Sequence, residues 1–113
     1  GGVAMACDLS NLNSVRSFAR EVHTKIPQLD VVCLNAGIAP STKSIRPPLT
    51  TQGFEACIGV NHLGHFLLAQ LIVSKLEASS TNNTLGSGRL VITASSVHCA
   101  EMKRVQLWGR IPG

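Results

Sequence analysis

Small polar residues follow three short apolar runs of this sequence, and they are the first candidates for chemistry. Asp8 follows the apolar run at residues 3–7, Asn35 follows the run at 29–34, and Ser95 follows the run at 90–94. A carboxylate, an amide and a hydroxyl can each hydrogen-bond a ligand. Any one of them taken alone is more simply a turn residue, but three in succession favour a binding site.

The residues after the middle run also favour a ligand site. Asn35 is followed by Ala36 and Gly37, and such small residues let a ligand approach the backbone closely. In open parallel sheets, ligands bind outside the carboxyl ends of the strands, where helix N-termini also point. We therefore expect Asp8, Asn35 and Ser95 at one edge of a sheet.

Hydrophobic patterning predicts the elements that position these residues. The three apolar runs are continuous rather than alternating, which is typical of strands in a parallel sheet that helices cover on both faces. Between the first two runs, residues 10–26 carry apolar side chains at helical spacing, with Ser10 as a candidate cap. Pro27 ends this predicted helix.

The second predicted helix covers residues 51–76 and contains an expected irregularity. Gly59 and Gly64 flank the polar Asn61 within it, and this grouping predicts a break or kink. Loops are expected over residues 38–50 and 78–88, which are rich in proline, serine, threonine or asparagine.

Strand, helix, strand, helix, strand is the succession of a parallel α/β fold. Three strands and two helices are too few to cover both faces of such a sheet. The predicted fold class is therefore α/β, a partial Rossmann-type doubly wound parallel sheet that forms part of a larger domain.

Composition excludes several classes of protein. With 44% hydrophobic and 14% charged residues, the chain is globular rather than disordered. Its net charge of +4 is scattered among few aromatic residues, so we expect no nucleic-acid surface. The longest apolar stretch, residues 66–73, is far shorter than the roughly 20 residues that cross a bilayer, so no transmembrane segment is expected.

The cysteines and histidines predict no metal site and no disulfide framework. The four cysteines form no CxxC pair, and three lie in apolar segments, which favours buried free thiols in a reducing compartment. His62 and His65 are one helical turn apart, but they lack a third ligand or a nearby acid.

Three segments together resemble the central part of the short-chain dehydrogenase/reductase superfamily. They are LDVVCLNAG (29–37), GFEACIGVNHLGHFLL (53–68) and GRLVITASSVH (88–98). Within the superfamily, the sequence is most similar to the retinol dehydrogenase and protochlorophyllide oxidoreductase groups. The resemblance implies that residues 1–98 are the central part of an NAD(P)-binding Rossmann-fold domain and that residues 99–113 are a divergent tail.

The resemblance also implies which residues bind the dinucleotide. Asp8, with the backbone of Leu9, would contact the adenine. Asn35, Ala36 and Gly37 would line the adenosine ribose side of the cleft. A purely structural hydrogen bond across the sheet is the alternative for Asn35.

The catalytic roles implied by the resemblance fall on Asn61 and Ser95. Asn61 would break the helix so that its main-chain carbonyl holds a water molecule of the proton relay. Ser95 would hydrogen-bond the substrate carbonyl, with Ser96 as the alternative serine. The family's TGxxxGxG turn and YxxxK pair do not occur in this sequence, which has no tyrosine. The chain alone is therefore expected to be inactive.

The implied function is an NADP-dependent oxidoreductase, retinol dehydrogenase-like, that transfers hydride between nicotinamide and a carbonyl or alcohol. NAD is the alternative cofactor, and a protochlorophyllide reductase-like enzyme is the alternative activity. A truncated, non-catalytic product that binds a partner through its sheet edge is the alternative of another class. The expected partner is a small-molecule substrate, and both a monomer and a homo-oligomer are compatible with the sequence. By analogy, the protein is expected inside the cell, in the cytoplasm, in a plastid or on the endoplasmic reticulum surface.

Overall fold

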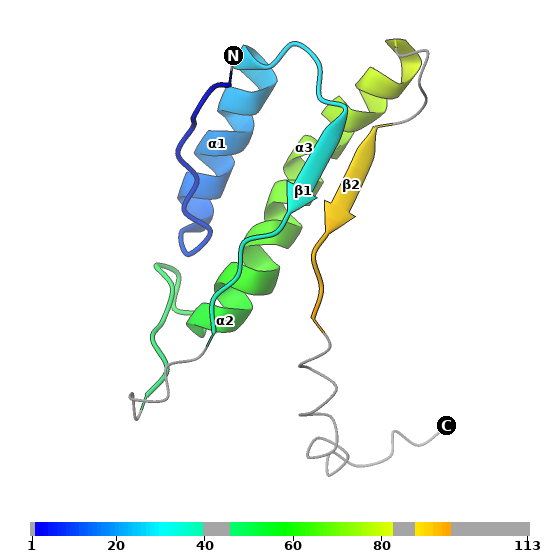
Figure 1. Cartoon of the computed structure of the whole chain (residues 1–113). Coiled ribbons are helices and arrows are strands. Elements are labelled where there is room, and N and C mark those ends of the chain that lie inside the picture. The colour runs from blue at the N-terminus through cyan, green and yellow to red at the C-terminus, as the bar shows by residue number, and fades with distance from the viewer. Residues whose placement is uncertain (1, 40–45, 83–87, 96–113) are drawn as a thin grey trace, which may run out of the picture.

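The computed structural model describes residues 2–39, 46–82 and 88–95. Its elements, in chain order, are α1 (Leu12–Lys25), β1 (Val31–Leu34), α2 (Ala56–Ile58), the π-helical turn η1 (Gly59–Gly64), α3 (His65–Asn82) and β2 (Arg89–Ile92). Strands β1 and β2 run parallel, with the register set by Val31 opposite Arg89 and Leu34 opposite Ile92. Figure 1 shows α3 passing behind β1. The predicted parallel α/β class is confirmed.

Helix α1 begins one residue later than the sequence suggests. Asn11, rather than Ser10, is its N-cap, and its side-chain oxygen accepts a hydrogen bond from the backbone N–H of Asn13. The expectation for Ser10 was wrong because its hydroxyl donates to the Asp8 carboxylate. The helix ends at Lys25, two residues before Pro27. This end was expected because proline has no backbone N–H to continue the helix.

The second predicted helix is shifted toward the C-terminus. It begins at Ala56 instead of residue 51, because the side chain of Glu55 caps the backbone N–H groups of Cys57 and Ile58. It continues as α3 to Asn82, beyond the predicted end at residue 76. The break predicted around Asn61 is confirmed, since Gly59–Gly64 forms a π-helical turn.

The apolar run at residues 3–7 was predicted as a strand, and it is not one in the structure. A doubly wound sheet gives the reason. In its 3-2-1-4-5-6 strand order, strand 3 is separated from strand 4 by two other strands. If residues 3–7 occupy position 3, then β1 and β2 at positions 4 and 5 pair with each other and leave residues 3–7 without a neighbour. Met5 and Cys7 still pack on the edge of the core.

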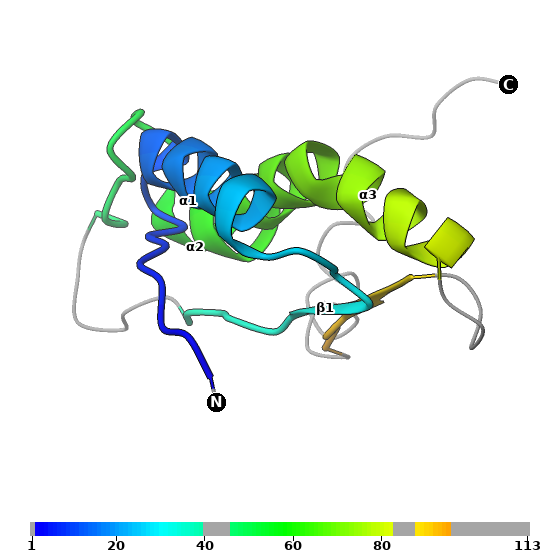
Figure 2. The ribbon, with the colours of Figure 1, turned by 90° about the horizontal axis from the view of Figure 1, so that it is seen from above.

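The core lies between the two long helices and one face of the sheet. It consists of Val15, Ala19 and Val22 from α1, Leu34 from β1, and Leu68 and Ile72 from α3. Figure 2 shows α1 and α3 together on one side of the strands. Large apolar side chains on the strands are exposed, namely Val31, Leu90, Val91 and Ile92. Val31 and Val91 lie on the face away from the helices, whereas Leu90 and Ile92 share the face of Leu34 in the register. Among the described residues, the helices therefore leave one face bare and cover the β2 part of the other face only in part.

The structure corrects one expectation from composition and bears on a second. Cys33 is exposed and Cys7 and Cys57 are only partly buried, so the predicted burial of the thiols was wrong, although all three are free. Cys99 lies outside the described residues. The helical segment Ala56–Ala78 is long and apolar enough to cross a membrane, with a mean hydropathy of 1.5. The sequence did not suggest this, but the core helix of a soluble protein can meet the same criteria.

Candidate active site

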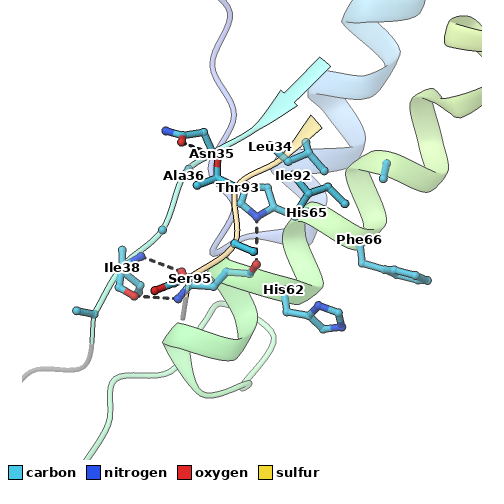
Figure 3. Close-up of a pocket in the computed structure, with 15 residues that line it drawn as sticks. Leu34, Asn35, Ala36, Ile38, His62, His65, Phe66, Ile92, Thr93 and Ser95 are labelled. Atoms are coloured by element: carbon cyan, nitrogen blue, oxygen red, sulfur yellow. Dashed lines mark hydrogen bonds between the residues drawn. The ribbon is translucent and has the colours of Figure 1, made fainter. Parts of the chain in front are cut away.

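A pocket of about 830 Å³ opens where β1 and β2 end. Its wall comes from the residues that follow the two strands, from η1 and from the first turns of α3. Figure 3 shows these segments converging from opposite sides. Ligands of open parallel sheets bind at this end of the strands.

Asn61 joins the π-helical turn to the segment after β1. Its Oδ1 accepts a hydrogen bond from the backbone N–H of Ile38 at 2.8 Å, and its Nδ2 donates to the carbonyl of Ile38 at 2.9 Å. An amide that pairs with both polar groups of one residue fixes that residue in position and orientation. Asn61 thereby links the two walls of the pocket.

Asn35 holds the ends of the two strands together. The hydroxyl of Thr93 donates to Asn35 Oδ1 at 2.8 Å, and the backbone N–H of Thr93 donates to the carbonyl of Leu34 at 3.0 Å. The structural alternative for Asn35, a hydrogen bond across the sheet, is therefore present. Asn35 also lines the pocket. The bond to Thr93 therefore does not prevent Asn35 from contacting a ligand.

Small residues leave the strand side of the pocket open. Ala36 and Gly37 line it, and a Cβ atom added at Gly37 would meet only Asn61, at 3.5 Å from Oδ1. Ser95 is exposed and lines the same pocket two residues after Thr93. The structure thus brings five of the predicted site residues to one pocket, namely Asn35, Ala36, Gly37, Asn61 and Ser95.

Asp8 and Leu9 do not line this pocket. The Asp8 carboxylate accepts hydrogen bonds from the hydroxyl of Ser10 at 2.7 Å and from its backbone N–H at 2.9 Å. Both bonds lower the pKa of Asp8, and the bond from the hydroxyl has the larger effect. The carboxylate is therefore a charged acceptor at neutral pH. Leu9 lies against η1, since a Cβ added at Gly64 would come within 2.6 Å of the Leu9 carbonyl oxygen.

Sequence reasoning missed several pocket residues. Ile38 was placed in a loop without a role, and Thr93 was counted only as part of a strand. His65, which was interpreted as an ordinary helix residue, lines the pocket with its Nδ1 3.2 Å from the carbonyl oxygen of Asn61. Its position one turn after Asn61 was the available signal. Ser96, the alternative serine, lies outside the described residues, as does His98.

The lining of the pocket carries little charge. Among the described residues around it there is no aspartate, glutamate, lysine or arginine. The described part of the chain also contains no group of three or more histidine, cysteine or acidic side chains that could hold a metal ion. The site can therefore orient a ligand by hydrogen bonds and apolar contacts.

A family model for short chain dehydrogenase matches residues 2–107. The chain belongs to the short-chain dehydrogenase family. It is 40% identical over 98 residues to retinol dehydrogenase 14 of Mus musculus, a match that covers 85% of this chain and 26% of the relative. It is 43% identical over 88 residues to protochlorophyllide reductase B of Hordeum vulgare, a match that covers 78% of this chain and 21% of the relative.

Solved structures share the fold of this chain. The RhlG/NADP complex of Pseudomonas aeruginosa matches with a TM-score of 0.63 and 22% identity, over 81% of this chain and 34% of that one. An alcohol dehydrogenase of Thermococcus sibiricus, complexed with 5-hydroxy-NADP, matches with a TM-score of 0.58 and 26% identity, over 80% of this chain and 35% of that one. The chain spans about a quarter of the length of the curated relatives that it matches. The predicted domain boundary at residue 98 lies outside the described residues and stays a prediction.

Proposed function

We propose that this chain supplies the middle of the active site of an NADP-dependent oxidoreductase that acts on a carbonyl or an alcohol, with retinal and retinol as the substrate pair. The observation that carries the proposal is the pocket that Asn61, Ser95 and the Asn35–Gly37 wall line together. The identity to retinol dehydrogenase 14 supports the choice of substrate. NAD is the alternative cofactor, since one structural relative was solved with NADH.

The residues present fit a dinucleotide. Asn35, Ala36 and Gly37 form a wall without bulky side chains, next to open space. Asp8 is a charged acceptor that suits the amino group of an adenine, with the Leu9 backbone beside it. When bound, the reduced cofactor supplies the hydride.

The chain's own residues orient the substrate and the proton relay. The hydroxyl of Ser95 donates a hydrogen bond to the substrate carbonyl oxygen and polarises the bond that hydride attacks. The carbonyl of Asn61, at the π-helical turn, accepts a hydrogen bond from relay water. The chain has no tyrosine, so a tyrosine that donates the proton has to come from outside this sequence.

A chimeric enzyme tests the proposal. Residues 2–95 replace the matching segment of mouse retinol dehydrogenase 14, and the oxidation of NADPH is followed with all-trans-retinal. We expect turnover in the chimera, and a loss of about 100-fold or more in kcat when Ser95→Ala removes the polarising donor. Ser17→Ala, an exposed serine on α1, is the matched control and should leave kcat unchanged.

Two outcomes would contradict the assignment. A chimera that folds and binds NADPH but turns over neither substrate would favour the non-catalytic alternative. Turnover with protochlorophyllide but not with retinal would favour the protochlorophyllide reductase-like activity, which the identity to the Hordeum vulgare enzyme supports as the second candidate. An unchanged kcat in Ser95→Ala would exclude Ser95 as the polarising donor.

A further inference from the structure

His65 brings a titratable group into a pocket that otherwise has few. Its ring lies beside the Asn61 main chain, with Nδ1 3.2 Å from the Asn61 carbonyl oxygen (Figure 3). The Asn61 carbonyl is the group to which the proposed function assigns the proton-relay water. A histidine ring on the same oxygen is therefore in a position to affect proton transfer.

The π-helical turn makes this contact possible. In an α-helix, the backbone N–H of His65 would donate to the carbonyl four residues earlier, that of Asn61. Here it donates to the carbonyl of His62 instead. The Asn61 carbonyl is thus released from its α-helical partner, and the His65 ring takes that place.

The geometry fixes the tautomer of His65. A carbonyl oxygen can only accept a hydrogen bond, so the bond requires a proton on Nδ1. In the neutral ring, Nε2 is then the unprotonated nitrogen, and a second proton can add there without breaking the bond to Asn61. Protonation of His65 changes the charge at the pocket while the Asn61 carbonyl stays oriented.

Few other groups compete for this role. Among the described lining residues, the only other titratable side chain is His62, which is on the same helical segment and has its ring against Phe66, 6.2 Å between centroids. The strand ends opposite contribute the uncharged Asn35, Thr93 and Ser95. A proton on His65 therefore faces no carboxylate from either strand end.

We propose that His65 is a positioning residue of the proton relay, which orients the Asn61 carbonyl through Nδ1–H and exchanges protons with pocket water through Nε2. This inference rests on the proposed function. Each carbonyl reduction consumes one hydride and one proton, so the His65 imidazolium gives its Nε2 proton to the water relay and regains one from solvent. In alcohol oxidation the proton moves the opposite way. A carbonyl oxygen has two lone pairs, so that of Asn61 can accept both from Nδ1–H of His65 and from a relay water.

The tautomer can be tested directly in the full 113-residue chain. Long-range ¹H–¹⁵N correlation spectra of ¹⁵N-histidine-labelled protein distinguish Nδ1–H from Nε2–H. We expect the Nδ1–H form for His65. His23 is the internal control, because its Nε2 lies 2.8 Å from the Leu71 carbonyl oxygen, away from the pocket, and it should be in the Nε2–H form. An Nε2–H form at His65 overturns the inference.

The function of the ring is tested in the chimera of the preceding subsection, by the pH profile of kcat. His65→Asn places an amide N–H where Nδ1 stood but cannot titrate, whereas His65→Leu removes both properties. We expect His65→Asn to flatten the pH profile of kcat, because an amide cannot exchange protons with the relay, and His65→Leu to lower kcat a further two- to tenfold through loss of the hydrogen bond. His23→Gln should keep the parental profile.

These outcomes separate the two proposals. A pH profile of His65→Asn that parallels the parent overturns the relay role of His65, while the activity of the parent still supports the proposed function. An inactive parent chimera contradicts the proposed function. The tautomer of His65 in the 113-residue chain then decides whether His65 orients the Asn61 carbonyl.

Discussion

Replacing Asn61 with alanine should separate the two walls of the pocket. The substitution removes both hydrogen bonds to the backbone of Ile38, at 2.8 and 2.9 Å, and leaves the π-helical turn without its link to the segment after β1. A typical hydrogen bond contributes about 0.5–1.5 kcal/mol net. Two such bonds correspond to a loss of about 1–3 kcal/mol in the free energy of unfolding, and the exposure of Asn61 favours the lower half of that range.

Urea unfolding of the full chain, followed by circular dichroism at 222 nm at low micromolar concentration, measures this loss. A 1 kcal/mol change in a domain of about 100 residues also shifts the melting temperature by roughly 4–8 °C. Asn13→Ala is the matched control, since Asn13 is exposed on α1 and alanine is the better helix former. It should be neutral or slightly stabilising.

Asn61→Asp refines the experiment. It keeps an acceptor for the Ile38 N–H but directs a second oxygen at the Ile38 carbonyl, where Nδ2 donated before. We expect it to be no more stable than Asn61→Ala. If Asn61→Ala unfolds within about 0.3 kcal/mol of the parent, then the side chain does not connect the two walls and the account of the pocket is wrong.

Three further perturbations test other parts of the account. Gly64→Ala should destabilise the chain by about 1–3 kcal/mol in urea unfolding, because the new Cβ would come within 2.6 Å of the Leu9 carbonyl oxygen; a stabilised variant would mean that Leu9 does not lie against η1. Hydrogen bonds from the backbone N–H groups of Cys57, the larger cause, and of Ile58 hold the pKa of Glu55 below its usual value of 4.5. The stability that Glu55 contributes is therefore present above pH 4.5 and is lost as the pH falls through the lowered pKa. Glu55→Gln should therefore weaken the loss of helical circular dichroism on acidification, and an identical acid transition in both proteins would contradict the capping role. The 113-residue chain by itself should oxidise no NADPH in the presence of all-trans-retinal, and steady oxidation above a protein-free control would show that another residue replaces the tyrosine.

Local signals predicted the fold where each element could be decided from its own residues. Pro27 marks the end of α1, and the continuous apolar runs at β1 and β2 predicted their parallel pairing. The run at residues 3–7 has the same local pattern and yet forms no strand. Strand formation depends on a neighbour in space, and the pattern of a single run does not contain that information.

Helix ends depended on side chains from other segments. The N-terminus of α1 is supported from the chain 40 residues away, where Gln52 Oε1 accepts a hydrogen bond from the Leu12 N–H at 3.0 Å. The sequence suggested Ser10 as the cap, although the adjacent Asn11 has a similar cap propensity. The Asp8 carboxylate decided between them by accepting from Ser10.

The pocket was predictable at residues whose type alone is unusual for their position. Asn61 is a polar residue between two glycines in an apolar helix, and Asn35 and Ser95 each end an apolar run. Ile38 carries no such signal, because it offers only its N–H and carbonyl to Asn61. His65 carried only its position one turn after Asn61, because the π-helical turn brings it to the Asn61 carbonyl.

The π-helical turn η1 explains why three segments far apart in the sequence converge on one site. Thr50 packs against Gly59, where an added Cβ would collide with the Thr50 methyl group, and a Cβ added at Gly64 would lie 2.6 Å from the Leu9 carbonyl oxygen. Between these two contacts, Asn61 binds the segment after β1. The two glycines are thus needed for close approach and Asn61 for the polar link. The same irregularity that brings the segments together also places the Asn61 carbonyl within reach of the His65 ring.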